Sequence, residues 1–178
     1  MKWLLAACVM FAVSFMARPA YTANLPPAVA SYLGSLAADC YEVGGLPEKP
    51  RPWFMLLADL NGDGIEDWII KDDGFVCDRA AGLYGGSGGS QVTVFVGLPN
   101  GEARQAVGNG AYAMKLEQHG ATTTLWLAVG GRLCGQAHPR DMADARQCWR
   151  PIAWNAATGR FGFAPLSRIR IVSPDVSK

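Results

Sequence analysis

The sequence predicts an α+β protein with one N-terminal helix and a mostly antiparallel β region, built from hairpins as a sandwich or a small barrel. Apolar residues recur at three- and four-residue spacing over residues 25 to 40, which is typical of a helix. From residue 53 onward, short apolar or alternating runs follow one another, and turns rich in glycine and proline separate them. Strands joined by such short turns are antiparallel neighbours, so we expect hairpins.

The helix is expected to begin at Pro26 and Pro27, because proline suits the first turn of a helix. It should end near Gly44 and Gly45. Residues 46–52 are rich in proline and predict a stiff polar linker that cannot be helical. One face of the helix is predicted to consist of Leu25, Val29, Leu33, Leu36 and Cys40.

The predicted strands fall into pairs. The first pair, residues 53–58 and 68–71, lies on either side of an acidic loop. Asn100-Gly101 is a strong hairpin turn signal between two further strands. The remaining predicted strands are 91–96 with 102–107, 112–117 with 122–129, 149–154 with 160–163, and a last short strand at 169–172.

The first 23 residues have the order of an export signal. Lys2 precedes an apolar run from residue 3 to residue 16, and small residues follow up to Ala23. The run is shorter than the roughly 20 apolar residues that span a bilayer. Cleavage is predicted after Ala23, with cleavage after Ala17 or Ala20 as alternatives.

A lipoprotein signal is a second interpretation of the same segment. Residues 5–8 have the local form of a lipobox with Cys8 as the lipidated residue. The apolar run before Cys8 is very short and continues beyond it, which argues against lipidation. The chain is therefore expected to be periplasmic or secreted, without a lipid anchor.

Residues 24–178 have the size of one domain with its own core. The whole chain has 16 basic and 15 acidic residues, and loss of Lys2 and Arg18 with the signal leaves 14 basic ones. This balance provides no basic excess that would attract nucleic acid or an anionic membrane. No second apolar run is long enough to cross a membrane.

Four cysteines remain after the signal, and an even number in an exported chain favours disulfides. Three pairings are conceivable. Cys40–Cys77 and Cys134–Cys148 are preferred because each joins neighbours along the chain. The absence of a Cys-x-x-Cys spacing argues against thiol redox chemistry and against a zinc site.

The acidic loop from residue 59 to residue 67 is the most specific chemical feature. Oxygen atoms at positions 1, 3, 5, 7 and 9 of a tight loop can converge on one hard cation, and Gly64 at position 6 permits the sharp turn. Many oxygens on a flexible loop favour Ca²⁺ over Mg²⁺, and the lack of His or Cys disfavours zinc. The predicted ligands are Asp59, Asn61, Asp63, Ile65 through its carbonyl, and Asp67. The alternative is an ordinary polar turn.

This segment resembles the calcium loop of FG-GAP/VCBS-type repeats, as in integrin α-subunit propellers. In that family the pattern Asp-x-Asp/Asn-x-Asp-Gly-x-x-Asp lies between two strands, and the resemblance covers about residues 53–71. Ile70 stands at position 12, where EF-hand and dockerin loops place an acid. A propeller needs about four to eight blades, and this chain has one loop and no repeat. The chain as a whole resembles small exported bacterial proteins that carry one such loop.

The expected function is that of a non-enzymatic, exported calcium-binding domain whose ion stabilises a hairpin loop. One alternative is an interaction module with a protein partner in the envelope, such as an inhibitor of a lysozyme-like hydrolase. Another is a metal-assisted hydrolase. Ser87 and Ser90 lack a Gly-x-Ser-x-Gly elbow, and the two histidines, His119 and His138, fall in predicted turns, so no serine-hydrolase triad is predicted.

The sequence also predicts where several residues outside the acidic loop lie. Residues 82–90 are rich in glycine and are expected to form a flexible loop near the ion. Asp72 and Asp73 are expected on the solvated surface, with Asp72 considered as an additional donor to the ion. The five tryptophans after the signal are expected in the core, with Trp53 and Trp68 packed beneath the acidic loop.

Overall fold

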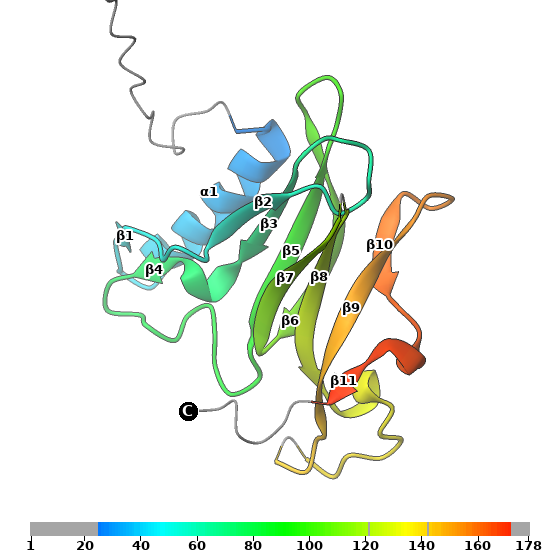
Figure 1. Cartoon of the computed structure of the whole chain (residues 1–178). Helices are drawn as coiled ribbons and strands as arrows, with labels where there is room; N and C mark the ends of the chain where they lie inside the picture. Colours follow the sequence, from blue (N-terminus) through cyan, green and yellow to red (C-terminus); the bar gives the residue numbers. More distant parts are fainter. Residues whose placement is uncertain (1–24, 121, 142, 172–178) are drawn as a thin grey trace, which may run out of the picture.

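The computed structural model describes residues 25–120, 122–141 and 143–171 as one helix and three antiparallel sheets. The predicted mostly β architecture with an N-terminal helix is confirmed (Figure 1). The predicted signal at 1–23, with Cys8, lies outside the described residues, as does Val172 of the last predicted strand. The helix that the structure describes is not long and apolar enough to cross a membrane.

Helix α1 spans Pro27–Glu42, so it begins at the predicted prolines and ends two residues before Gly44. Pro26 is the residue that precedes the first turn, and Leu25 therefore lies outside the helix. At the other end Gly44 adopts a φ of +76°, which favours glycine. The amide of Gly45 then donates to the carbonyl of Cys40 at 2.9 Å and closes the helix end.

Two larger sheets form the body of the molecule. The first has the strand order β2-β3-β5-β6, with β2 at Met55–Ala58, β3 at Asp67–Lys71, β5 at Ser90–Gly97 and β6 at Ala103–Ala111. The second has the order β10-β9-β8-β7, with β7 at Ala113–His119, β8 at Thr122–Gly130, β9 at Gln147–Asn155 and β10 at Arg160–Phe163. Strand β11, Arg170–Ile171, also pairs with β9.

The smaller elements connect these layers. Strands β1 (Pro47–Glu48) and β4 (Val76–Cys77) form a two-stranded sheet. The predicted linker at 46–52 therefore contains a short strand, because its backbone finds a partner far along the chain. Three short 3₁₀ helices complete the described part, namely η1 at Asp72–Gly74, η2 at Gly131–Cys134 and η3 at Leu166–Arg168.

The predicted hairpins are confirmed, and the largest difference in strand length is in β6. Strand β6 continues to Ala111 rather than ending at Val107. Its segment Gly108-Asn109-Gly110 has the composition of a turn, but its backbone pairs with β5 as far as Ser90. The pairing with a long neighbouring strand thus overrides the local preference of these residues.

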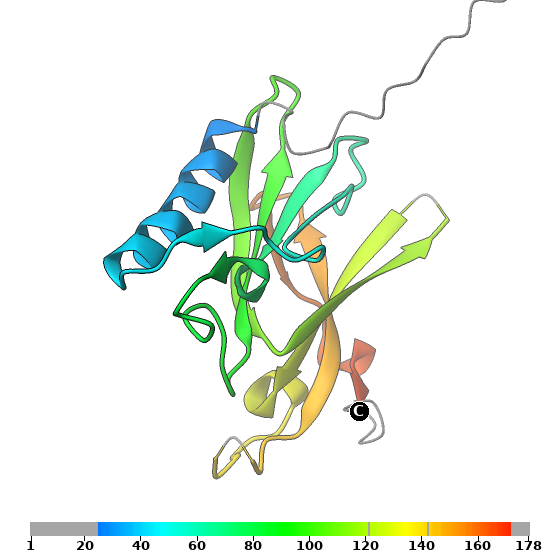
Figure 2. The same cartoon turned by 90° about the vertical axis from the view of Figure 1, so that its left-hand side faces the viewer.

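The first sheet is the middle of three layers. Helix α1 covers one of its faces, and the second sheet covers the other (Figures 1 and 2). Neighbouring residues of β3 serve the two interfaces, since Ile69 belongs to the core between the sheets and Ile70 to the core beneath the helix. Both side chains are fully buried.

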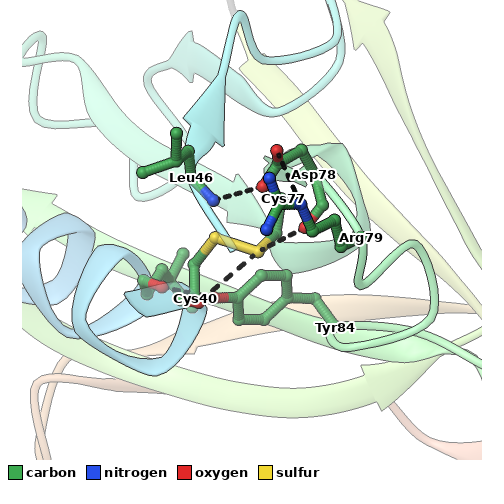
Figure 3. Close-up of a disulfide and its surroundings, with 7 residues drawn as sticks. Cys40, Leu46, Cys77, Asp78, Arg79 and Tyr84 are labelled. Atoms are coloured by element: carbon green, nitrogen blue, oxygen red, sulfur yellow. Dashed lines mark hydrogen bonds and ion pairs between the residues drawn. A yellow bond between two sulfur atoms is a disulfide. The ribbon is translucent and has the colours of Figure 1, made fainter. Parts of the chain in front are cut away.

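The disulfides are Cys40–Cys77 and Cys134–Cys148, which confirms the preferred pairing. The first joins the end of α1 to β4, and Figure 3 shows Tyr84 beside it. The hydroxyl of Tyr84 donates to the carbonyl of Leu36 on the same helix. Two disulfides indicate a protein that folds in an oxidising environment.

The tryptophan prediction is correct only in part. Trp126 is buried, but Trp53 is 46 % exposed in the turn before β2, where the guanidinium of Arg51 lies 5.4 Å from its ring centre. Trp53 also lies at the end of β2 that is remote from the acidic loop. Trp68 packs against the core beneath the helix rather than beneath the loop.

Ile69→Ala is expected to destabilise the protein by about 2–5 kcal/mol, because it empties a fully buried site between the two sheets. Leu57→Ala is the matched control, since Leu57 lies on the neighbouring strand and is 41 % exposed. Urea unfolding followed by circular dichroism measures both. Equal losses of stability in the two variants would contradict the layer arrangement.

Candidate functional site

The acidic loop connects β2 to β3, which pair antiparallel with Ala58 opposite Asp67. Strands therefore flank the loop on both sides, as its sequence predicts. Gly62 and Gly64 adopt φ values of +80° and +83°, a region that residues with a side chain rarely enter. These two glycines allow the chain to curl back on itself within a few residues.

The loop folds around its own carboxylates. Asp59 accepts hydrogen bonds from the amides of Gly62 at 2.7 Å and Gly64 at 2.8 Å. The side-chain oxygen of Asn61 accepts from the amide of Asp63 at 3.0 Å. One carboxylate oxygen of Asp63 accepts in turn from the amide of Ile65 at 2.8 Å. Acidic and amide oxygens thus face the loop backbone.

Asp67 ties the loop to the body of the protein. Its side chain is fully buried at the start of β3. It accepts from the amide of Leu60 at 2.9 Å and from the amide of Gly97, at the end of β5, at 3.1 Å. Burial raises the pKa of Asp67 to about 6, and the negative charges of Asp63 and Asp59 act in the same direction.

No lysine or arginine pairs with the loop carboxylates in the described ranges. Four acidic side chains, Asp59, Asp63, Glu66 and Asp67, therefore share a nine-residue segment without such a counter-charge, and Asp67 is buried. Burying a charged group without such compensation is costly. The arrangement favours the arrival of a cation.

The structure brings the five predicted positions into one loop but does not arrange their side chains as a finished coordination sphere. Within the described residues, no three His, Cys, Asp or Glu side chains lie close enough to share a metal ion. Two of the five predicted donors are of other kinds, the amide oxygen of Asn61 and the carbonyl of Ile65. Ion binding here requires the side chains of Asn61 and Asp63 to rotate toward Asp67.

Comparison of this chain with known proteins identifies no relative. No family model, curated protein or solved structure matches this chain. The loop's resemblance to FG-GAP/VCBS-type repeats therefore stays a prediction that rests on its residues. The site must be interpreted from its own geometry.

A second acidic group lies at the opposite end of β3. Asp72 follows the strand in η1 and is only 7 % exposed. The hydroxyl of Tyr32, on α1, lies 2.9 and 3.0 Å from its two carboxylate oxygens. Thr93, on β5, donates to the oxygen of Tyr32 at 3.1 Å. This network joins the helix to the sheet.

Two predictions about Asp72 are wrong. It is not on the solvated surface, because the chain turns into η1 after β3 and places the carboxylate beneath Tyr32. It also does not supplement the acidic loop, since it follows Lys71 at the far end of the strand that Asp67 begins. Its partner lies 40 residues earlier in the sequence, so no local pattern signals the contact.

The glycine-rich segment 82–90 lies at this same end of β3, so the prediction that it adjoins the ion is also wrong. Together with Asp72 and Gly110 it lines a cavity of about 460 Å³. The amide of Asp73 donates to the hydroxyl of Ser90 at 2.9 Å. No histidine lines this cavity, so Ser90 has no imidazole beside it that could act as its base.

The pH dependence of stability tests the buried position of Asp72. Burial raises the pKa of Asp72 to about 6. The groups around it are Tyr32 and Asp39 of α1, Lys71, which pairs with Asp73, and Tyr84. Since the folded-state pKa lies above the unfolded value of about 3.9, Asp72 favours folding at low pH and opposes it as pH rises through about 6.

Asp72→Asn removes this titration and keeps the shape of the side chain. The stability of the variant relative to the wild type is expected to rise by up to about 3 kcal/mol between pH 4 and pH 8. Urea unfolding of both proteins at the two pH values measures the difference, and the contribution of Asp67 cancels because both proteins contain it. Parallel pH profiles would show that Asp72 is not buried in this way.

Proposed function

We propose that the chain is an exported calcium-binding domain, periplasmic or secreted, in which the ion clamps the β2–β3 hairpin and has no catalytic role. The observation that carries the proposal is Asp67, a fully buried carboxylate without a cationic partner in the described ranges, with three further acids, Asp59, Asp63 and Glu66, in its loop. A divalent cation supplies the missing charge. Carboxylate, amide and carbonyl oxygens are the ligands that Ca²⁺ prefers.

The proposed ligands are oxygen atoms of Asp59, Asn61, Asp63, Ile65 (main chain) and Asp67. A carboxylate oxygen that accepts one N–H retains a second lone pair, so the hydrogen bonds of Asp59 and Asp67 are compatible with ion binding. Asp63 is exposed at the loop surface and Asn61 is half-buried, and rotation of their side chains moves them toward the buried Asp67. The glycines at 62 and 64 allow the backbone to adjust.

A structural role suits the surroundings of the loop. The cavity beside Ser90 and the pocket beside His119 are lined by none of the proposed ligands. His119 instead lies 3.6 Å from Glu117 on its own strand. The ion's contribution is then to neutralise the loop and to fasten it to β5 through Asp67 and Gly97.

Calcium is expected to raise the unfolding temperature of the metal-stripped protein. A free Ca²⁺ concentration of 100 times the Kd stabilises the folded state by about 2.7 kcal/mol. For a domain of this size, that corresponds to a rise in Tm of about 5–10 °C. Differential scanning calorimetry with added Ca²⁺ or with EDTA measures the shift. Superimposable curves under the two conditions would contradict the proposal.

Asp63→Ala and Glu66→Ala form a matched pair for this experiment. Both remove one negative charge from the same loop, but only Asp63 stands at a proposed ligand position. The calcium-dependent rise in Tm is expected to disappear in Asp63→Ala and to persist in Glu66→Ala. Equal responses of the two variants would mean that calcium binding depends only on the overall charge of the loop, and would contradict the role of Asp63 as a ligand.

A further inference from the structure

The outward face of the second sheet carries an unusual set of side chains. Its other face packs into the core through Leu125 and Leu127 of β8. Residues directly opposite each other on paired strands share a face, so the register defines the outward set. The pairs are Lys115 with Trp126, Glu117 with Thr124, His119 with Thr122, and Arg170 with Trp149.

Aromatic rings hold the cations of this face in place. The guanidinium of Arg170 lies 3.9 Å from the ring centre of Trp126. The ammonium of Lys115 lies 4.8 Å from the ring centre of Trp149 and 5.8 Å from that of Trp126. Such contacts fix the position of a charge that would otherwise move freely in solvent.

Glu117 fixes the same cations from the side. Its carboxylate oxygens lie 2.7 and 2.8 Å from Nη1 of Arg170, and one of them lies 2.8 Å from Nζ of Lys115. The hydrogen bond from Lys115 has the largest effect on the pKa of Glu117, and together with that from Arg170 it lowers this pKa to about 2. Glu117 engages only Nη1 of Arg170, and within the described residues the N–H groups of Nε and Nη2 are available to another acceptor.

A pocket of about 430 Å³ opens on this face, and we call it the outer-sheet pocket. Every side chain that lines it carries a hydrogen-bond donor, and none is a carboxylate; the lining residues are His119, Thr122, Thr124, Trp126, Arg168 and Arg170. Arg168 forms no ion pair with a carboxylate in the described part of the chain. Trp126 is 3 % exposed, and its buried Nε1–H has no acceptor there either.

We propose that the outer-sheet pocket binds an oxyanion, a carboxylate or a phosphate group, carried by a ligand of the size of one sugar. A guanidinium with free N–H groups pairs with such groups through two parallel hydrogen bonds. Lys115, Arg168 and Arg170 outnumber the single acid Glu117, so the face is locally positive although the whole chain is nearly neutral. The pocket volume lies within the usual range for small-molecule sites, about 300–1,000 Å³.

The threonines explain why a sugar-sized ligand fits better than a bare ion. Thr122 and Thr124 line the pocket. The hydroxyl of Thr124 can both donate to and accept from a hydroxyl of such a ligand, whereas that of Thr122 donates to the carbonyl of His119 at 3.1 Å and can accept from the ligand. The site is independent of the acidic loop, because none of its lining residues lies between 59 and 67. Binding at the two places is therefore separable by experiment.

Nuclear magnetic resonance of the tryptophan indole N–H groups tests the proposal directly. The probes are glucuronate and glucose 6-phosphate, with glucose as the neutral control. The Trp126 signal, identified by its loss in Trp126→Phe, is expected to shift saturably with at least one of the two anions and not with glucose. Response to glucuronate alone assigns the site to carboxylates, and response to glucose 6-phosphate alone assigns it to phosphates.

Arg170→Gln is expected to weaken binding of the responding anion at least tenfold. Arg51→Gln is the matched control, because Arg51 also lies over a tryptophan, Trp53, but outside the pocket. The proposal would be overturned if the chemical shift of the Trp126 indole N–H did not change with either anion through the millimolar range. It would equally be overturned if glucose acted like the anions, or if Arg51→Gln weakened binding as much as Arg170→Gln.

Discussion

The structure depends on the burial of β3 on both of its faces. Ile69 and Ile70 are adjacent and fully buried, one between the two sheets and the other beneath the helix. A strand in this position cannot carry polar side chains at its centre, so its polar residues gather at its two ends. There Asp67 accepts backbone amides of the loop and of β5, and Asp72 accepts the hydroxyl of Tyr32 on α1. Apolar packing fixes the middle of the strand, and carboxylates fix its ends.

The two ends differ in how their charge is balanced. Next to Asp72, Lys71 is buried and pairs with Asp73, and Tyr32 donates directly to the carboxylate. Next to Asp67, among the described residues, the groups that act on the carboxylate are backbone amides and further acids. The proposed calcium ion would do at the loop what Lys71 and Tyr32 do at the other end. This difference is the physical reason for treating the loop as the ion-binding site and the Tyr32–Asp72 network as a structural joint.

Local sequence patterns predict the elements that are determined by residues close together in the chain. The helix at 27–42, the hairpins and the disulfide partners all follow from spacing, turn residues and chain neighbourhood. The spacing of Asp59, Asn61 and Asp63 in the acidic loop is visible in the sequence, and it is the basis of the calcium prediction. The orientation of those side chains was not, since it depends on hydrogen bonds to amides such as that of Gly64.

Features that depend on distant parts of the chain could not be predicted. The local sequence around Asp72 is that of a surface residue, and only the contact with the distant Tyr32 shows that it is buried. Residues 82–90 lie beside Asp72 because β5 enters the sheet at Ser90, and nothing in their composition specifies this. On the outward face of the second sheet, Lys115 of β7 and Arg170 of β11 meet the tryptophans of β8 and β9 only through the sheet register.

Native-state hydrogen exchange of the acidic loop and of strands β2 and β3, with and without calcium, tests the central claim most directly. An ion that clamps this hairpin should slow exchange of its amides by up to about 100-fold at 100 times the Kd, since each opening must first release the ion. Amides of the exposed turn between β9 and β10, in the other sheet, should exchange unchanged. Equal exchange of the loop amides with calcium and with EDTA would contradict the account.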